Sequence, residues 1–159
     1  MLARRSQSGF SLVEVVITVA IIGVLASAAA PLTETVVRRS KEQELKTALM
    51  TLRNAIDAYK EAADGGRVEK PAGESGYPKS LDVLVAGVTD KQSPSGAKIY
   101  FLRRIPRDPL ADPAQAADKT WGLRSYDSPP DAPREGKDVY DVYSLASGDG
   151  LDGSPYREW

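Results

Sequence analysis

The chain has 159 residues and a formal net charge of −1, so its charge gives no sign of a nucleic-acid partner. It contains no cysteine and no histidine. The first absence excludes disulfides and thiolate metal sites, and the second removes the commonest general base and every Ser-His or Cys-His catalytic pair. The length suits one modest domain, in which any metal site must use oxygen ligands.

A short basic segment precedes a long apolar stretch at the N-terminus. Residues 1–9 include two arginines, and residues 10–30 contain a single ionisable side chain, that of Glu14. A helix of about 21 residues, at about 1.5 Å per residue, crosses the roughly 30 Å apolar core of a bilayer. No small-x-small cleavage site follows the apolar stretch. Residues 10–30 are therefore predicted to stay in the mature protein as a transmembrane helix.

The single acid in this stretch requires an explanation. A charged side chain in a bilayer core costs about 2.5–3.5 kcal/mol on insertion scales, so Glu14 is interpreted as functional. If the chain were cut after Gly9, the new α-amino group of Phe10 would lie about one helical turn from Glu14. At the other end of the stretch, Pro31 removes a backbone donor and disfavours helix at Ala30, which predicts a bend there.

These features together resemble a known signal. A basic leader, Gly9, the run Phe10-Ser11-Leu12-Val13-Glu14, an apolar stretch and Pro31 are similar to the prepilin signal of type IV pilins and type II secretion pseudopilins. The resemblance implies cleavage between Gly9 and Phe10 by a prepilin peptidase, N-methylation of Phe10, and assembly into a helical filament. In that filament, Glu14 of one subunit would neutralise the Phe10 ammonium of a neighbour and set the axial register. The alternative is an uncleaved signal anchor.

Residues 31–63 are predicted to form an amphipathic helix, the spine of the head, which the resemblance places outside the cytoplasm. Apolar residues recur every three or four positions along one stripe, namely Leu45, Leu49, Leu52, Ile56 and Tyr59. Charged residues occupy the opposite faces: Lys41, Glu42, Glu44, Lys46, Arg53, Asp57 and Lys60. The run Asp64-Gly65-Gly66 predicts that the helix ends at about Ala63.

The remaining residues, 64–159, combine loops with short elements. Residues 67–76 are predicted to form a loop, and residues 77–85 contain a short helix with Ser80 as a possible N-cap. Candidate strands are residues 98–102, 123–126 and 139–144, the last being the clearest because it is β-branched and aromatic. The predicted fold is α+β and pilin-like: a long N-terminal helix packed against a small antiparallel sheet.

The C-terminal half narrows the resemblance. Tyr77-Pro78, residues 100–109, Trp121-Gly122, residues 138–144 and Trp159 are similar to the major pseudopilins of type II secretion systems. The resemblance implies a structural subunit, not an enzyme, that polymerises to drive protein export. Implied partners are a prepilin peptidase, an inner-membrane assembly platform and minor pseudopilins. The implied location is the bacterial inner membrane, crossed once, with the head in the periplasm. A type IV pilus subunit and a signal-anchored binding or enzymatic domain are the alternatives.

Residues 145–154 alternate oxygen-bearing side chains with glycines. Calcium takes 6–8 oxygen ligands, and glycine-rich backbone can turn its carbonyls inward to supply some of them. Resemblance to the major pseudopilins implies a calcium site in this loop. The ligands carried over are Asp149, Asp152, the carbonyl of Leu145, Ser147 and Ser154. The loop is shorter than the family pattern and its acidic residues differ, so a polar turn without an ion is the alternative.

Overall fold

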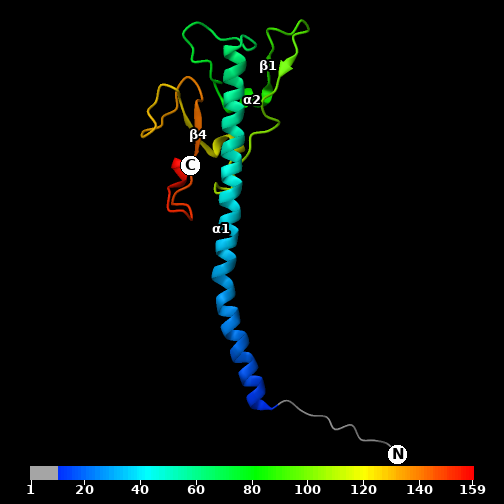
Figure 1. The fold of residues 1–159 in the computed structure, drawn as a ribbon, viewed down its shortest axis with the longest axis vertical. Helices are drawn as coiled ribbons and strands as arrows, with labels where there is room; N and C mark the ends of the chain where they lie inside the picture. The colour runs from blue at the N-terminus through cyan, green and yellow to red at the C-terminus, as the bar shows by residue number, and fades with distance from the viewer. Residues whose placement is uncertain (1–10) are drawn as a thin grey trace, which may run out of the picture. The chain divides into compact units, whose positions relative to one another are not determined.

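The structure, a computed structural model, describes the backbone of residues 11–159 and the side chains of residues 11–26 and 34–159. Contacts divide the chain into two compact units, one ending at Arg39 and the other formed by Ser40–Trp159. Helix α1 (Leu12–Asp64) is 53 residues long (Figure 1). Its residues contribute to both units. All other elements belong to the second unit.

Helix α1 keeps helical backbone through Pro31. The predicted bend at Pro31 stays a prediction. In the part of the chain that the structure describes, no helix is sufficiently long and apolar to cross a membrane. The predicted span of residues 10–30 begins outside that part, and it stays a prediction.

The C-terminal end of α1 agrees with its glycine signal. The helix ends at Asp64, one residue beyond the predicted position. Gly66 follows with a φ of 72°, a left-handed conformation that favours glycine, and the Arg67 amide donates to the Ala62 carbonyl at 2.8 Å. This reversal leads the chain out of the helix and into the loops of the head.

The predicted apolar stripe of α1 is the centre of the core. Leu45, Leu52 and Ile56 are fully buried, and the other two members of the stripe, Leu49 and Tyr59, are buried as well. They form one cluster with residues from every part of the head, including Val68, Leu81, Leu84, Leu102, Trp121, Val139, Val142 and Tyr156. The stripe therefore packs against other residues of the same domain.

The short helix α2 (Leu81–Ala86) faces this core with Leu81 and Leu84. Ser80 occupies its N-cap position with extended backbone, but its side chain makes no capping hydrogen bond. The carbonyl of Leu84 accepts hydrogen bonds from the amides of Phe101 and Leu102, each at 3.0 Å. These bonds tie the chain after the second strand to the end of α2.

The described residues contain two separate two-stranded antiparallel sheets, where the sequence predicted a single small sheet. Strand β1 (Val88–Thr89) pairs with β2 (Lys98–Ile99), and β3 (Trp121–Arg124) pairs with β4 (Asp141–Ser144). Strand β1 was not predicted, and the boundaries of the other three differ from the prediction. The α+β fold itself, with a long helix and small antiparallel sheets, is confirmed.

The differences at the strand ends follow from where the backbone amides donate. Phe101 and Leu102 donate to helix α2, so β2 ends at Ile99. The Val139 amide donates to the Pro78 carbonyl at 2.8 Å, which delays the start of β4. Within the second sheet, Gly122 lies opposite Tyr143, and a Cβ at Gly122 would come within 2.3 Å of the Tyr143 ring.

Two short 3₁₀ helices complete the fold of the described residues, η1 (Ala117–Lys119) and η2 (Tyr156–Glu158). Helix η2 belongs to the C-terminal segment, defined here as residues 145–159. This segment lies beside α1 (Figure 1), and its Leu151 amide donates to the Glu42 carboxylate of that helix at 3.0 Å.

Candidate functional site

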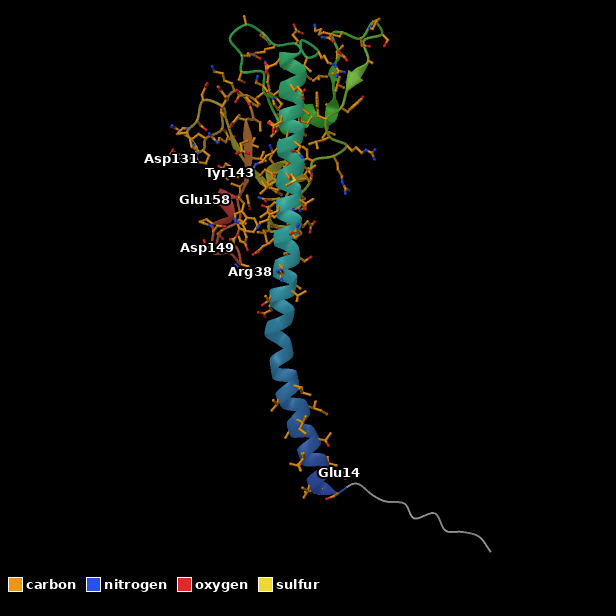
Figure 2. The ribbon with its side chains drawn as sticks, in the orientation of Figure 1. Glu14, Arg38, Asp131, Tyr143, Asp149 and Glu158 are labelled. Carbon is orange, nitrogen blue, oxygen red and sulfur yellow. The ribbon has the colours of Figure 1, made fainter. Side chains whose placement is uncertain are left out.

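The predicted processing residues Gly9 and Phe10 lie outside the described residues. Glu14 lies in the first turn of α1 (Figure 2). Its backbone carbonyl accepts a hydrogen bond from the Thr18 hydroxyl at 2.7 Å. The Glu14 side chain is exposed. Its pairing with Phe10, and the register that this pairing would set, stay predictions.

Glu14 stands on a helical segment whose apolar side chains are exposed. The large ones are Leu12, Val13, Val15, Val16, Ile17, Val19, Ile21, Ile22, Val24 and Leu25. A continuous apolar surface of this kind marks a membrane-facing or protein-facing contact. The Glu14 carboxylate is the one charge of this segment.

The C-terminal segment brings only some of the predicted calcium ligands together. Asp152 Oδ1 accepts hydrogen bonds from the Ser154 amide at 3.0 Å and the Ser154 hydroxyl at 2.6 Å. Asp149 is exposed and forms a backbone bridge with Pro155. Leu145 and Ser147 are exposed residues near the start of the segment.

The donor set fits calcium poorly in this arrangement. Besides its bonds to Ser154, Asp152 places Oδ2 3.7 Å from the Lys46 ammonium. The two hydrogen bonds from Ser154, with a smaller contribution from Lys46, hold the pKa of Asp152 below its usual range. Within the described residues, no group of three or more acidic, histidine or cysteine residues could hold a metal. The calcium site therefore stays a prediction.

Trp159 also contacts Ser154 and packs against Tyr156 within the same segment. Its indole Nε1 donates to the Ser154 hydroxyl at 2.6 Å, and its ring contacts Tyr156 edge-on at 5.1 Å between centroids. Gly150 lies directly under this indole, because a Cβ at Gly150 would come within 2.2 Å of the Trp159 ring and 2.9 Å of Asp152 Oδ1. A side chain at position 150 is incompatible with this closed arrangement.

The residue that positions the start of the segment was not among the predicted site residues. Asp108, 1% exposed, accepts hydrogen bonds from the Ser144 hydroxyl at 2.6 Å and from the Leu110 amide at 2.7 Å. The Ser144 hydroxyl in turn accepts from the Ala146 amide at 3.1 Å. Asp108 therefore holds the end of β4 and the first residues after it.

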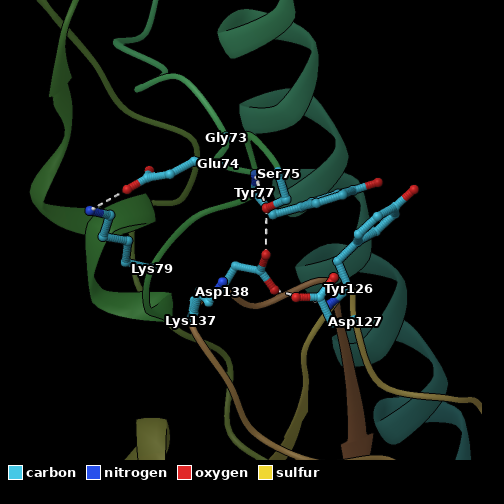
Figure 3. A pocket seen from close by; sticks show the side chains of 9 residues that line it. All are labelled: Gly73, Glu74, Ser75, Tyr77, Lys79, Tyr126, Asp127, Lys137 and Asp138. Carbon is cyan, nitrogen blue, oxygen red and sulfur yellow. Dashed lines mark hydrogen bonds and ion pairs between the residues drawn. The ribbon is translucent and has the colours of Figure 1, made fainter.

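A surface hollow of about 520 Å³ was also not predicted, because three distant stretches of chain meet to form it (Figure 3). Its lining residues are Gly73, Glu74, Ser75, Tyr77, Lys79, Tyr126, Asp127, Lys137 and Asp138. Lys79 pairs with Glu74 at 3.1 Å, and Asp138 accepts a hydrogen bond from Ser75. The rings of Tyr77 and Tyr126 stack with centroids 5.7 Å apart. Much of the polar lining is thus engaged in contacts within the head.

Comparison with known proteins decides the family. Residues 4–30 match the family model described as a prokaryotic N-terminal methylation motif. The chain is 34% identical to the type II secretion system core protein G of Aeromonas hydrophila over 113 residues. This matched stretch is 70% of this chain and 73% of that protein. The chain belongs to the type II secretion system core protein G family.

Two further members of the core protein G family show how much of the chain is covered. The protein of Vibrio cholerae serotype O1 is 30% identical over 152 residues, which is 94% of this chain and 86% of that protein. The protein of Klebsiella michiganensis is 31% identical over 110 residues, which is 67% of this chain and 70% of that protein. No solved structure matches the chain. The resemblance to type II secretion pseudopilins drawn from the sequence is thus confirmed.

Proposed function

We propose that this chain is a structural subunit of a type II secretion pseudopilus, and that its polymerisation into a helical filament drives protein export. Membership of the core protein G family and the methylation motif at residues 4–30 support this function. The structural observation that carries the proposal is the N-terminal part of α1, where exposed apolar side chains surround a single carboxylate, that of Glu14.

The physical basis of assembly is the pairing of two charges in an apolar environment. Cleavage after Gly9 gives Phe10 a free ammonium, which N-methylation keeps positively charged. In the filament core the dielectric constant is low, so an unpaired Glu14 carboxylate is costly and a paired one is strongly attracted to its partner. The Phe10 ammonium of a neighbouring copy is that partner. Each subunit can then enter the filament only at the axial position where the two charges meet.

The rest of the proposal concerns location and partners. Residues 10–30 anchor the chain in the bacterial inner membrane before assembly, and the head lies in the periplasm. The chain performs no chemistry of its own. A prepilin peptidase processes it, and an inner-membrane assembly platform and minor pseudopilins help to build the filament. A type IV pilus subunit would share the N-terminal features, but the relatives are named for type II secretion, which favours the pseudopilus.

The direct test is Glu14→Ala, compared with Glu34→Ala on the same helix as a matched control outside the apolar segment. Both variants are expressed with the prepilin peptidase and the secretion assembly components, and filaments sheared from the cells are quantified by electron microscopy and immunoblotting. We expect Glu14→Ala to lower the filament yield at least about tenfold, because one ammonium per contact is left unpaired. Glu34→Ala should assemble normally, and Glu14→Asp should be milder because it keeps the charge.

Mass spectrometry of the membrane fraction completes this test. Every variant should insert into the membrane and begin at N-methylated Phe10. A lower filament yield then reflects a defect in assembly and not in processing. A normal filament yield for Glu14→Ala contradicts the proposed pairing. A mature chain that still begins at Met1 contradicts the proposed processing.

A further inference from the structure

The C-terminal segment contacts one side of helix α1 through three charged residues, Glu42, Lys46 and Arg53. Their spacings of four and seven positions place them along the same side of the helix. The sequence pattern put all three opposite the apolar stripe. In the structure, however, Glu42 is buried and Arg53 is half-buried. The reason is that residues 145–159 cover this side of α1, which no local periodicity can show.

Glu42 is the most buried of the three, with 7% of its surface exposed. Its Oε1 accepts hydrogen bonds from the Leu151 amide at 3.0 Å and from the Tyr156 hydroxyl at 2.9 Å. A buried carboxylate is tolerated where hydrogen-bond donors compensate for lost hydration. Glu42 thereby joins the middle of the C-terminal segment and its η2 helix to a single point on α1.

Lys46 lies one helical turn beyond Glu42. Its ammonium is 3.7 Å from Asp152 Oδ2 and 4.1 Å from the centre of the Trp159 ring. Asp152 is bonded to Ser154, and Ser154 is bonded to the Trp159 indole. The four side chains therefore form a closed circle of contacts, with the positive charge of Lys46 between a carboxylate and an aromatic face.

Arg53 completes the contact two turns further along. Its Nε donates to Asp141 Oδ1 at 2.8 Å, and its Nη2 donates to the Val142 carbonyl at 3.1 Å and to the Trp159 carbonyl at 2.5 Å. One guanidinium thus joins β4 to the end of the C-terminal segment. A planar group with several fixed donors is well suited to such a three-way contact.

A divalent cation at Asp152 would compete with these contacts. Oδ1 of Asp152 already accepts from Ser154, and Oδ2 faces the Lys46 ammonium, which carries the same sign of charge as the ion. Binding at Asp152 would require Lys46 to move away, and the Trp159 ring would lose its cation.

We propose that Glu42, Lys46 and Arg53 of α1 hold the C-terminal segment closed, with the Lys46 ammonium in the place of a bound divalent cation. The segment then stays closed without calcium. This inference does not rest on the proposed function, because it concerns the stability of the segment in a single copy. If the inference holds, the segment is closed by the Lys46 contact and not by calcium. One experiment can distinguish these two alternatives.

The experiment is hydrogen–deuterium exchange of the full chain in detergent micelles, in calcium chloride and in chelator. Peptides from residues 145–159 report the segment, and peptides from residues 45–59 report the core. For the unmutated chain we expect segment exchange rates in the two solutions to agree within about twofold. Lys46→Met should accelerate segment exchange about three- to tenfold in both solutions, as expected for loss of one exposed ion pair and one cation–π contact. Lys46→Arg should restore most of the protection.

Two further variants serve as controls. Lys41→Met removes an exposed lysine from the same helix and should exchange like the unmutated chain. Asp152→Asn removes the other partner of the ion pair without altering α1, so it should accelerate segment exchange even if Lys46→Met disturbs the helix. The proposal is overturned if calcium slows segment exchange more than about tenfold in the unmutated chain. It is equally overturned if Lys46→Met and Asp152→Asn both exchange like Lys41→Met.

Discussion

The Asp138 carboxylate joins separate stretches of the head at the hollow drawn in Figure 3. It accepts hydrogen bonds from Ser75, from the Ser125 hydroxyl at 2.8 Å and from the Tyr126 amide at 2.9 Å. Partial burial raises the pKa of Asp138. The hydrogen bonds from Ser75, Tyr126 and Ser125 together lower it by more than burial raises it, so the pKa lies below the usual value. Asp138 is therefore most stabilising while it is ionised.

This shift gives a pH-dependent prediction. Because the folded pKa of Asp138 is depressed, its contribution is complete above the usual aspartate pKa of about 3.9 and is lost as the pH falls through the lower folded value. Asp138→Ala should lower the free energy of unfolding by about 1–3 kcal/mol at pH 7, since three donors lose their acceptor. Urea unfolding at pH 7 and pH 3 measures this loss, which should shrink at pH 3.

Asp127→Ala is the matched control, since Asp127 is an exposed carboxylate on the same hollow. It should change the free energy of unfolding by less than about 0.5 kcal/mol. An Asp138→Ala variant that loses as much stability at pH 3 as at pH 7 would show that the ionised carboxylate is not what stabilises this region.

At the scale of single elements, α1 contributes the centre of the core through its apolar stripe. Leu52 is fully buried, whereas its near neighbour Met50 is 64% exposed. Leu52→Ala should lower the free energy of unfolding by about 2–5 kcal/mol, because it removes buried contacts and leaves a cavity. Met50→Ala should lower it by less than about 0.5 kcal/mol.

Urea unfolding of the full chain in detergent, followed by tryptophan fluorescence to which buried Trp121 contributes, measures both changes. The two variants share one helix and lie two positions apart, so helix propensity alone cannot separate them. Similar losses for Leu52→Ala and Met50→Ala would mean that the stripe does not organise the core.

The elements were predictable to the extent that they follow local patterns. The stripe of α1 and its end at Asp64 depend on spacing and on glycine, which the sequence shows directly. Strand β1 is two residues long and has no pattern of its own. It follows Gly87, which has a φ of 73° and lies so close to the Tyr100 ring that a Cβ there would approach the ring to 2.7 Å.

The contacts of the C-terminal segment were not predictable for a different reason. Glu42 and Leu151 are 109 residues apart in sequence, and Arg53 and Trp159 are 106 residues apart. Charged residues on a helix usually face solvent, and nothing local distinguishes the ones that a distant segment will cover. The loop composition suggested oxygen ligands for a metal, and the structure shows the side-chain oxygens of two of these residues, Asp152 and Ser154, bonded to neighbouring side chains.

At the scale of the whole chain, the compact unit Ser40–Trp159 contains the entire core cluster. We therefore expect residues 40–159 to fold as an independent, soluble domain. Thermal unfolding followed by near-ultraviolet circular dichroism should show one cooperative transition.

A fragment of residues 44–159 is the matched comparison, since it keeps the stripe but lacks Glu42. It should unfold at a lower temperature, because the Leu151 amide and the Tyr156 hydroxyl lose a shared acceptor. A gradual, non-cooperative transition for residues 40–159 would argue against an independent domain. Equal midpoints for the two fragments would argue against the role of Glu42.

The close approach of Gly150 to Trp159 has a consequence for how this chain can diverge. A side chain at position 150 is tolerated only if the indole leaves, and without the indole the Lys46 ammonium loses one of its two neighbours. Substitutions at positions 46, 150, 152 and 159 should therefore be inherited together among homologous chains. A lineage that replaced Lys46 with an apolar residue would be free to change Gly150 and Trp159, and selection would then favour a different way of neutralising Asp152.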